Sequence, residues 1–336
     1  MKLIDYFGSL NRSSAVPILG YPGLTTEGIT VEQCLREPKL HAKVVRSNFE
    51  HFHPDAALPL LDLTIEAEYY GPRAEYNDLD PPQLNSSLTL ESWEDKTLHE
   101  SRIPLMVETA RLIEAQISEV PVGFYVTGPF TLAGQIVGVQ SLLMGMFKNP
   151  SGLLELLKSC TGTVVDYANQ LKEAEIDFLV IADPTSSLIS KRQFDDFSKP
   201  ALARVVNAFS NDSVLHICGR SGHLLKQMVD TGAKGLSLDD NVKLTDATAS
   251  VPKDVVIMGN YSPTKLAYES PETIRTEVRR MLDPLNGNGN VVASTGCDIS
   301  ASTPPANIHA FMRAVKTYAR NSMTSQDSHV TCLGNR

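Results

Sequence analysis

The sequence has no apolar run that approaches the roughly 18 residues needed for a membrane-spanning helix. Its first segment, MKLIDYFGSLNRSSAVPILG, has no apolar core of signal-peptide length, because Asp5 and Arg12 interrupt it. It also has no long Lys/Arg run, and its net charge of −9 disfavours binding to a phosphate backbone. We therefore expect a cytoplasmic protein that binds neither membrane nor nucleic acid.

Cysteine is scarce, with five residues in a chain of 336. A low, odd number is typical of free thiols, metal ligands or nucleophiles in a reducing compartment, and not of a disulfide framework. We interpret Cys34, Cys160 and Cys332 as small apolar fillers or exposed thiols, since they lie in an amphipathic segment, a helical pattern and a polar terminal stretch. Cys218 and Cys297 remain as candidates for chemistry.

What the chain does contain is an alternation of short apolar runs with longer amphipathic ones. Runs rich in Val, Ile and Leu predict strands that are buried on both faces. These predicted strands are residues 15–20, 56–61, 122–126, 178–182, 214–217, 235–238, 255–258 and 291–294. Helical patterns cover residues 150–174, 191–209, 223–231, 271–282 and 304–319.

Eight such units in a row predict an α/β fold, a single (β/α)8 TIM barrel with an N-terminal extension. The barrel should occupy residues 1–320, followed by a disordered C-terminal tail at 321–336. An open doubly wound sheet is the alternative, but the first predicted strand leads into Tyr21-Pro22-Gly23-Leu24, which is not a Gly-rich phosphate loop.

The sequence also predicts a lid and three helix starts. Residues 62–102 form a long insertion with little periodicity, which we expect to cover one end of the barrel like a lid. Ser270 before Pro271 predicts a helix start, and Ser190 and Thr303 are predicted to cap helices in the same manner.

One predicted strand ends in His216-Ile217-Cys218. Because residues two apart on a strand share a face, the imidazole and the thiol should project together at the carboxyl end of the strand, where barrel enzymes place their sites. Cys297 follows the last predicted strand, and Asp239 follows the sixth. All four side chains should therefore reach one rim of the barrel.

A His/Cys2/carboxylate set suits Zn²⁺ better than Mg²⁺ or Mn²⁺, because thiolates favour the softer ion. The alternative interpretation of His216 and Cys218 is a core histidine beside a buried cysteine. Structural zinc sites usually have ligands that lie close together in the sequence. These ligands are spread from residue 216 to residue 297, which indicates a catalytic site. The carboxylate of Asp239 would be the weakest of the four ligands, so an incoming thiol could displace it from the zinc. A thiol that binds zinc loses its proton. The predicted reaction is alkyl transfer to sulfur.

Several segments match a known family. They are Thr127-Gly128-Pro129-Phe130-Thr131-Leu132, Ala182-Asp183-Pro184, His216-Ile217-Cys218-Gly219, Gly235-Leu236-Ser237-Leu238-Asp239, Gly259-Asn260-Tyr261-Ser262-Pro263 and Thr295-Gly296-Cys297-Asp298, with Asp62-Leu63-Thr64 and Glu66. Through them the chain resembles the uroporphyrinogen decarboxylase superfamily over residues 16–320, and within it the methylcobamide:coenzyme M methyltransferase branch. The His-x-Cys…Cys set is the specific element of this resemblance.

The resemblance implies a barrel with zinc on His216, Cys218 and Cys297, and methyl transfer from a methylated corrinoid protein to coenzyme M. The family usually has Glu at the place of Asp239, so Asp240 or a water is an alternative fourth ligand. True decarboxylases carry an Arg-rich segment after the first strand, whereas residues 20–26 contain no arginine here. Decarboxylation of uroporphyrinogen is therefore the less favoured activity.

Other residues are candidates for binding substrate. Asp183 and Asn260 stand at strand ends and would order the thiol or nearby water, or else cap a helix or form a turn. Arg220 would hold an anionic tail, or else be a solvated rim residue. Asp62 and Tyr261 complete the predicted substrate-binding set, and the alternative for Asp62, as for Glu66, is that it only shapes the lid.

Three functional hypotheses remain open. The first is methyl transfer from a methylcobamide to a zinc-activated small thiol, with the corrinoid on a partner protein, since the chain has no Asp-x-His-x-x-Gly run. The second replaces the acceptor with tetrahydrofolate or homocysteine, or demethylates a substrate onto the corrinoid. The third is a non-catalytic zinc-binding partner of a corrinoid protein.

Overall fold

The computed structural model describes residues 2–85, 88–93, 100–285 and 288–318, so the predicted tail at 321–336 lies outside the described residues. Seven parallel strands form one sheet in the order β1-β9-β8-β7-β6-β5-β4, and β2 and β3 form a separate antiparallel hairpin. The strands are β1 (Ser14–Ala15), β2 (Arg73–Glu75), β3 (Gln83–Asn85), β4 (Gly123–Thr127), β5 (Phe178–Ala182), β6 (Ser213–Ile217), β7 (Gly235–Leu238), β8 (Val256–Tyr261) and β9 (Val291–Thr295).

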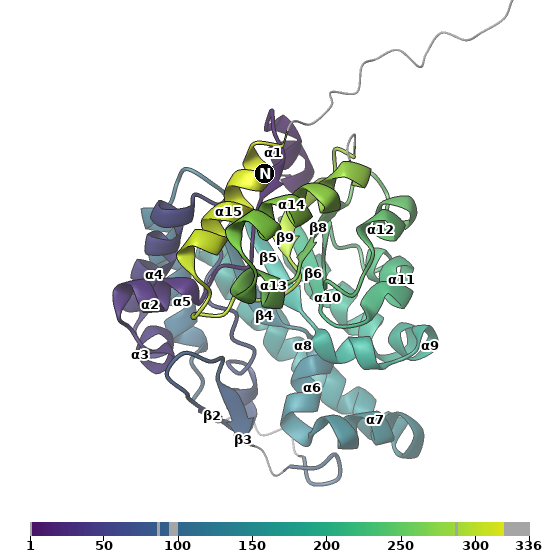
Figure 1. Ribbon diagram of the computed structural model, residues 1–336. Coiled ribbons are helices and arrows are strands. Elements are labelled where there is room, and N and C mark those ends of the chain that lie inside the picture. Colours follow the sequence, from purple (N-terminus) through teal and green to yellow (C-terminus); the bar gives the residue numbers. More distant parts are fainter. Residues whose placement is uncertain (1, 86–87, 94–99, 286–287, 319–336) are drawn as a thin grey trace, which may run out of the picture.

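Helices surround the strands of the sheet (Figure 1). The α-helices are α1 (Leu3–Ser9), α2 (Pro22–Glu27), α3 (Val31–Arg36), α4 (Pro38–Phe52), α5 (Ile103–Gln116), α6 (Pro129–Val137), α7 (Val139–Lys148), α8 (Pro150–Glu173), α9 (Lys191–Gln193), α10 (Lys199–Ala208), α11 (Leu225–Val229), α12 (Leu244–Ser250), α13 (Pro263–Tyr268), α14 (Pro271–Leu282) and α15 (Pro305–Lys316). The short helices are η1 (Ala67–Tyr70), η2 (Pro184–Leu188), η3 (Phe194–Ser198, a π-helix), η4 (Ser221–Leu224) and η5 (Asp283–Leu285).

The curled sheet closes through a segment that is barely a strand. The predicted strand at 15–20 is reduced to β1, and the one at 56–61 to a single bridge between Ala57 and Val122. Those two predictions were wrong because Pro17 and Pro59 lack the N–H that a strand ladder needs. The Ala57 N–H still donates to the Pro121 carbonyl at 2.9 Å, and the segment therefore joins β4. On its other side, the Asp55 N–H donates to the carbonyl of Ala15 in β1 at 2.8 Å, so the segment links β1 to β4 and the predicted barrel class is confirmed.

The predicted helices are found with some differences: the one at 223–231 begins in the 3-10 turn η4 and continues as α11, and the one at 304–319 is α15, with residue 319 outside the described residues. α14 has the predicted bounds, and the predicted helix at 191–209 is broken by the π-helical turn η3. Ser190 and Ser270 cap their helices as predicted. The predicted cap at Thr303 is wrong: α15 begins after Pro304 without a side-chain cap, and the Thr303 hydroxyl is buried without a hydrogen-bond partner.

Alternation along the strands determines which side chains enter the barrel. In β5, Phe178 and Val180 belong to the inner core, while Leu179 packs outward against the helices. In β6 the inner residue Val214 is followed two positions later by His216, which is also buried. By the same parity His216 faces the interior, and it lies at the carboxyl end of the barrel.

The opposite end of the barrel is closed by the N-terminal extension. Leu3 and Phe7 of α1 join the inner core, and the Leu3 N–H donates to Asp212 Oδ2 at 2.7 Å just before β6 begins. Because α1 fills the amino-terminal end, a small molecule has access to the interior from the carboxyl end, where the strands deliver His216.

The insertion at 62–102 is anchored by a buried ion-pair cluster. Arg102 donates to Asp62 Oδ2 at 2.6 Å, to Glu68 Oε1 at 3.0 Å and to Thr64 Oγ1 at 2.7 Å. All three charged side chains are buried. This cluster holds the first and last residues of the insertion together. The β2–β3 hairpin of the insertion extends away from the seven-stranded sheet (Figure 1).

Glu66 links the same insertion to the sheet. Its burial leads us to expect that the free energy of unfolding depends on pH. Its carboxylate accepts from the Thr127 N–H at 2.6 Å and the Thr127 hydroxyl at 2.7 Å. Burial nevertheless raises the pKa of Glu66 from 4.5 to about 7. A raised folded pKa favours the fold below pH 4.5, and this contribution is lost as pH rises through 7. Glu66→Gln does not ionise; its amide oxygen can still accept from the Thr127 N–H, and its amide nitrogen can donate to the Thr127 hydroxyl, which then donates to the Leu63 carbonyl. We expect this variant to gain up to about 3 kcal/mol over the parent chain between pH 5 and 8 in urea unfolding. A pH-independent difference would contradict the assignment.

Within the described residues, no single helix combines the length and apolarity required to cross a bilayer. α6 and α7 pass that test only as a pair, and the chain bends by 104° between them.

Candidate metal centre

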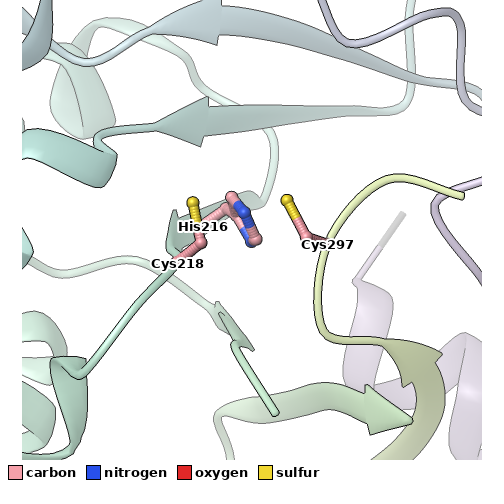
Figure 2. Close-up of side chains that lie close together, drawn as sticks. All are labelled: His216, Cys218 and Cys297. Atoms are coloured by element: carbon pink, nitrogen blue, oxygen red, sulfur yellow. The ribbon is translucent and has the colours of Figure 1, made fainter. Parts of the chain in front are cut away.

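Three predicted ligands meet at the carboxyl end of the barrel. His216 is at the end of β6, Cys218 follows two residues later on the same side, and Cys297 follows β9. One donor atom of each lies within 4.8 Å of the donors of the other two. Both sulfur atoms and the imidazole face a common space (Figure 2). Within the described residues, this is the one such group of three His, Cys, Asp or Glu side chains.

The imidazole of His216 is oriented by a neighbouring strand. Parallel pairing of β6 with β7 places His216 beside Ser237, and the His216 Nδ1 lies 2.9 Å from the Ser237 hydroxyl. The other ring nitrogen, Nε2, is buried and has no hydrogen-bond partner. A buried nitrogen without a partner is costly, and a metal ion would satisfy it.

The two thiols interact with one another. A hydrogen bond between Cys218 and Cys297 lowers the pKa of Cys218 and raises that of Cys297, whose burial raises it further. Two sulfur donors and one imidazole nitrogen are the donor set that zinc prefers, with three protein ligands and an open fourth position in catalytic sites. The residues present therefore fit Zn²⁺.

Ser237 gives a testable prediction about this centre. We expect Ser237→Ala to weaken zinc binding by about tenfold, because groups that orient a ligating histidine contribute to affinity at that scale. Competition against a metal-binding dye measures the change. Ser250→Ala on the exposed face of α12 is the control and should leave the affinity unchanged. Equal affinities for both variants would contradict a role for Ser237.

Asp239 does not join the three ligands. Its Oδ2 accepts from the Gly219 N–H at 2.8 Å, and its Oδ1 accepts from the Asn241 N–H at 2.9 Å and side chain at 2.6 Å. Burial raises the pKa of Asp239, but these hydrogen bonds outweigh it and lower the pKa overall. The carboxylate therefore holds the turn after Cys218. Asp240, the alternative ligand, is exposed and also lies outside the group.

Two glycines allow these loops to approach. A Cβ on Gly296 would lie 2.5 Å from the Asp240 backbone nitrogen, so only glycine lets the loop before Cys297 lie against the turn after β7. Gly219 has a φ of +82°, a conformation that favours glycine, and it turns the chain directly after Cys218. These contacts bring the Cys218 and Cys297 loops together.

Asp183 and Asn260 support loops near the site. Asp183 is fully buried and accepts from the Thr131 N–H at 2.7 Å and from the Ser186 hydroxyl at 2.7 Å, while burial raises its pKa. The Asn260 amide donates to the carbonyl of Asp239 at 2.7 Å. In this structure both side chains are engaged with protein groups, and a role in binding substrate stays a prediction.

The remaining predicted residues do not line the cavity onto which the three ligands open. Asp62 is committed to Arg102. Arg220 is exposed, and Tyr261 lines a separate surface pocket where burial raises its pKa. His223 has both ring nitrogens close to backbone carbonyls and is not part of the three-donor group.

A cavity of about 600 Å³ opens onto the three ligands. Its walls come from the end of the barrel, from α6 and from the β2–β3 hairpin of the insertion, as expected for the predicted lid. The residues that line it are Leu61, Leu63, Thr64, Pro81, Pro82, Gln83, Leu84, Gly134, Gln135, Gly138, Val139, Pro184, His216, Cys218, Cys297 and Asp298.

Sequence reasoning missed three polar residues of this site: Ser237, Gln135 and Asp298. Ser237 had a signal, since it interrupts an otherwise apolar strand. Asp298 is adjacent to Cys297, lines the cavity and has a buried Oδ1 without a partner. Burial, with the nearby Cys297, raises its pKa well above the ordinary value. Gln135 lies on α6, and nothing in its local sequence singles it out.

The chain is similar to known proteins both in sequence and in structure. The profile of the Uroporphyrinogen decarboxylase (URO-D) family matches residues 20–318. The methylcobamide:CoM methyltransferase MtbA of Methanosarcina acetivorans is 29% identical over 76% of this chain and 78% of its own length. A methylated-thiol–coenzyme M methyltransferase of Methanosarcina mazei is 28% identical over 83% of this chain and 77% of its own.

A solved methyltransferase structure from Methanosarcina mazei superposes with a TM-score of 0.84, at 25% identity, covering 93% of this chain and 96% of that one. The predicted family and fold are thus confirmed, and relatives of the predicted enzyme class are found by sequence and by structure. The chain therefore belongs to the uroporphyrinogen decarboxylase family and is a methyltransferase-type member of it.

Proposed function

We propose that this protein is a zinc-dependent methyltransferase that moves a methyl group from a methylated corrinoid, carried by a partner protein, to the sulfur of a small thiol. The observation that carries the proposal is the meeting of His216, Cys218 and Cys297 donors within 4.8 Å of one another, facing a cavity. Coenzyme M is the acceptor suggested by the names of the relatives. The corrinoid partner is suggested in the same way.

The reaction requires a sulfur nucleophile and a leaving group that accepts an electron pair. The carbon–cobalt bond of the methylcobamide breaks with both electrons going to cobalt, which becomes cobalt(I). A carbon–sulfur bond forms, and the thiol proton is released. Zinc held by His216, Cys218 and Cys297 would lower the pKa of the incoming thiol, so that the proton is lost at neutral pH.

The chain's own residues prepare this site. Ser237 keeps the Nδ1 side of the His216 ring engaged, so that Nε2 is presented to the metal. Asp239 holds the Gly219 turn and thereby the direction of Cys218. Leu61, Leu63 and Pro184 give the cavity an apolar wall, which limits water around the sulfur.

The test incubates the zinc-loaded protein with free methylcobalamin and a panel of small thiols. Thiol-dependent formation of cob(I)alamin, followed by absorbance, together with the matching methyl thioether by mass spectrometry, would support the proposal. The same protein stripped of zinc by a chelator is the control and should be inactive until zinc is restored.

Other outcomes point to the alternatives. Turnover with tetrahydrofolate or homocysteine would show that the acceptor is not a coenzyme M-like thiol. Methylation of cob(I)alamin by a methylated substrate would show that the protein transfers the methyl group to the corrinoid and not from it. One zinc per chain with no loss of methylcobalamin under any acceptor would indicate a non-catalytic partner of a corrinoid protein and overturn the proposal.

A further inference from the structure

We propose that the acceptor is a thiol with an apolar body larger than a two-carbon chain, and that Leu63, Leu84, Val139 and Pro184 bind this body while the sulfur lies at the metal. The inference rests on the proposed function and narrows its substrate class. It departs from coenzyme M, which has a two-carbon chain that ends in a charged sulfonate.

The cavity that opens onto the metal ligands has an apolar wall, part of which the chain itself leaves uncovered. Of the residues that line it, Leu63, Leu84 and Pro184 are half-buried, and Val139 is 41% exposed. Accessible apolar surface in a concave site is typical of a ligand-binding groove, because a ligand that covers this surface removes it from water. These four residues form what we call the apolar subsite.

The apolar subsite begins beside the metal ligands and extends away from them. Pro184 follows a residue whose backbone N–H donates to the His216 carbonyl at 2.9 Å. Leu84 lies on β3 of the hairpin, and Val139 is the first residue of α7, so both belong to elements outside the barrel strands. The hairpin and α7 lie at the same end of the molecule (Figure 1). An acceptor with its sulfur at the metal would therefore direct its body towards the hairpin and α7.

The size of the cavity also favours an acceptor larger than a two-carbon thiol. Its volume is about 600 Å³, within the range of roughly 300–1,000 Å³ that encloses drug-sized ligands. A two-carbon thiol fills only a small part of this volume, so most of the apolar subsite would stay in contact with water. An anionic tail would find the amide N–H groups of Gln83 and Gln135, but no lysine or arginine lies among the described residues that line the cavity. An apolar body therefore matches the wall better than a sulfonate does.

The experiment compares three thiols with the zinc-loaded protein and free methylcobalamin: ethanethiol, 1-butanethiol and 2-mercaptoethanesulfonate. The first two have alkyl thiols of the same reactivity, so the ratio of their rates reports the contacts of the body. Each buried methylene contributes about fourfold, and we therefore expect kcat/KM for 1-butanethiol to exceed that for ethanethiol by about tenfold. Equal values for these two, or best turnover with 2-mercaptoethanesulfonate, would overturn the inference and leave the proposed function standing.

Variants assign the effect to the apolar subsite. Leu84→Ala and Val139→Ala should each lower the ratio of kcat/KM for 1-butanethiol to that for ethanethiol by about fivefold. Leu154→Ala removes an exposed leucine of α8 that does not line the cavity, so it is the matched control and should leave the ratio unchanged. Zinc content must remain one per chain in every variant that is compared.

Two results with these variants would count against the inference. An unchanged ratio in both Leu84→Ala and Val139→Ala would show that these residues do not contact the acceptor. A higher KM for methylcobalamin, with KM for the thiols unchanged, would assign the apolar subsite to the corrinoid and would also overturn the inference.

A binding measurement separates this inference from the reaction itself. Calorimetry with the S-methyl products, 1-(methylthio)butane and 2-(methylthio)ethanesulfonate, needs neither turnover nor corrinoid. Tighter binding of the butyl thioether, weakened in Val139→Ala, would support the apolar subsite even if no thiol reacted and the proposed function failed. Tighter binding of the sulfonate would overturn it.

Discussion

Replacing Cys297 by alanine is expected to abolish stoichiometric zinc binding and to lower methyl transfer by on the order of a thousandfold. A metal that activates a nucleophile contributes several kcal/mol to the reaction, and the two ligands at the end of β6, His216 and Cys218, do not enclose an ion by themselves. Zinc content by mass spectrometry and the cob(I)alamin assay on the same preparation measure both effects.

The control for this variant is Cys34→Ala. Cys34 is fully buried among apolar residues, where burial raises the pKa of its thiol, and it lies outside the three-ligand group. It should keep both zinc and activity. A Cys297→Ala protein that retained full activity without bound metal would rule out the zinc mechanism.

Arg102→Met is expected to cost 3–5 kcal/mol of the free energy of unfolding, the scale of breaking a buried ion pair. The substitution keeps most of the side-chain volume but leaves Asp62 and Glu68 as buried carboxylates without their cation. Urea unfolding at neutral pH measures the loss. Because the cluster anchors the insertion whose hairpin lines the cavity, we also expect KM for the thiol to rise.

The matched comparison is Arg111→Met. Arg111 pairs with Glu108 at 3.7 Å on the exposed face of α5, and surface pairs of this kind contribute less than about 1 kcal/mol. A similar loss for both variants would show that the burial of the Arg102 cluster does not matter.

Predictions for the strands succeeded where burial alone determines the element. The apolar runs at 178–182 and 235–238 are the observed bounds of β5 and β7, and every residue of both strands is buried, as expected for strands that are covered on both faces. The predictions of the first two strands were wrong because they relied on the apolar pattern alone. A strand ladder also needs backbone N–H groups, which Pro17 and Pro59 lack.

At the site, side-chain parity was enough to bring His216 and Cys218 together, and the barrel topology added Cys297. Asp239 was expected to join them because it ends a neighbouring strand. A carboxylate at the start of a turn can instead accept from nearby backbone N–H groups, as Asp239 does from Gly219, and sequence alone does not decide between these partners. Gln135 reaches the cavity from α6 only through tertiary packing, which local sequence does not record.

The order of the ligands along the chain has a consequence for biosynthesis. His216 and Cys218 are synthesised about eighty residues before Cys297, which follows the last strand, β9, and only α15 completes the described fold after it. During translation the partial chain therefore offers only two of the three donors. An ion held by all three side chains, as we propose, would be enclosed only late in synthesis, once β9 has been made.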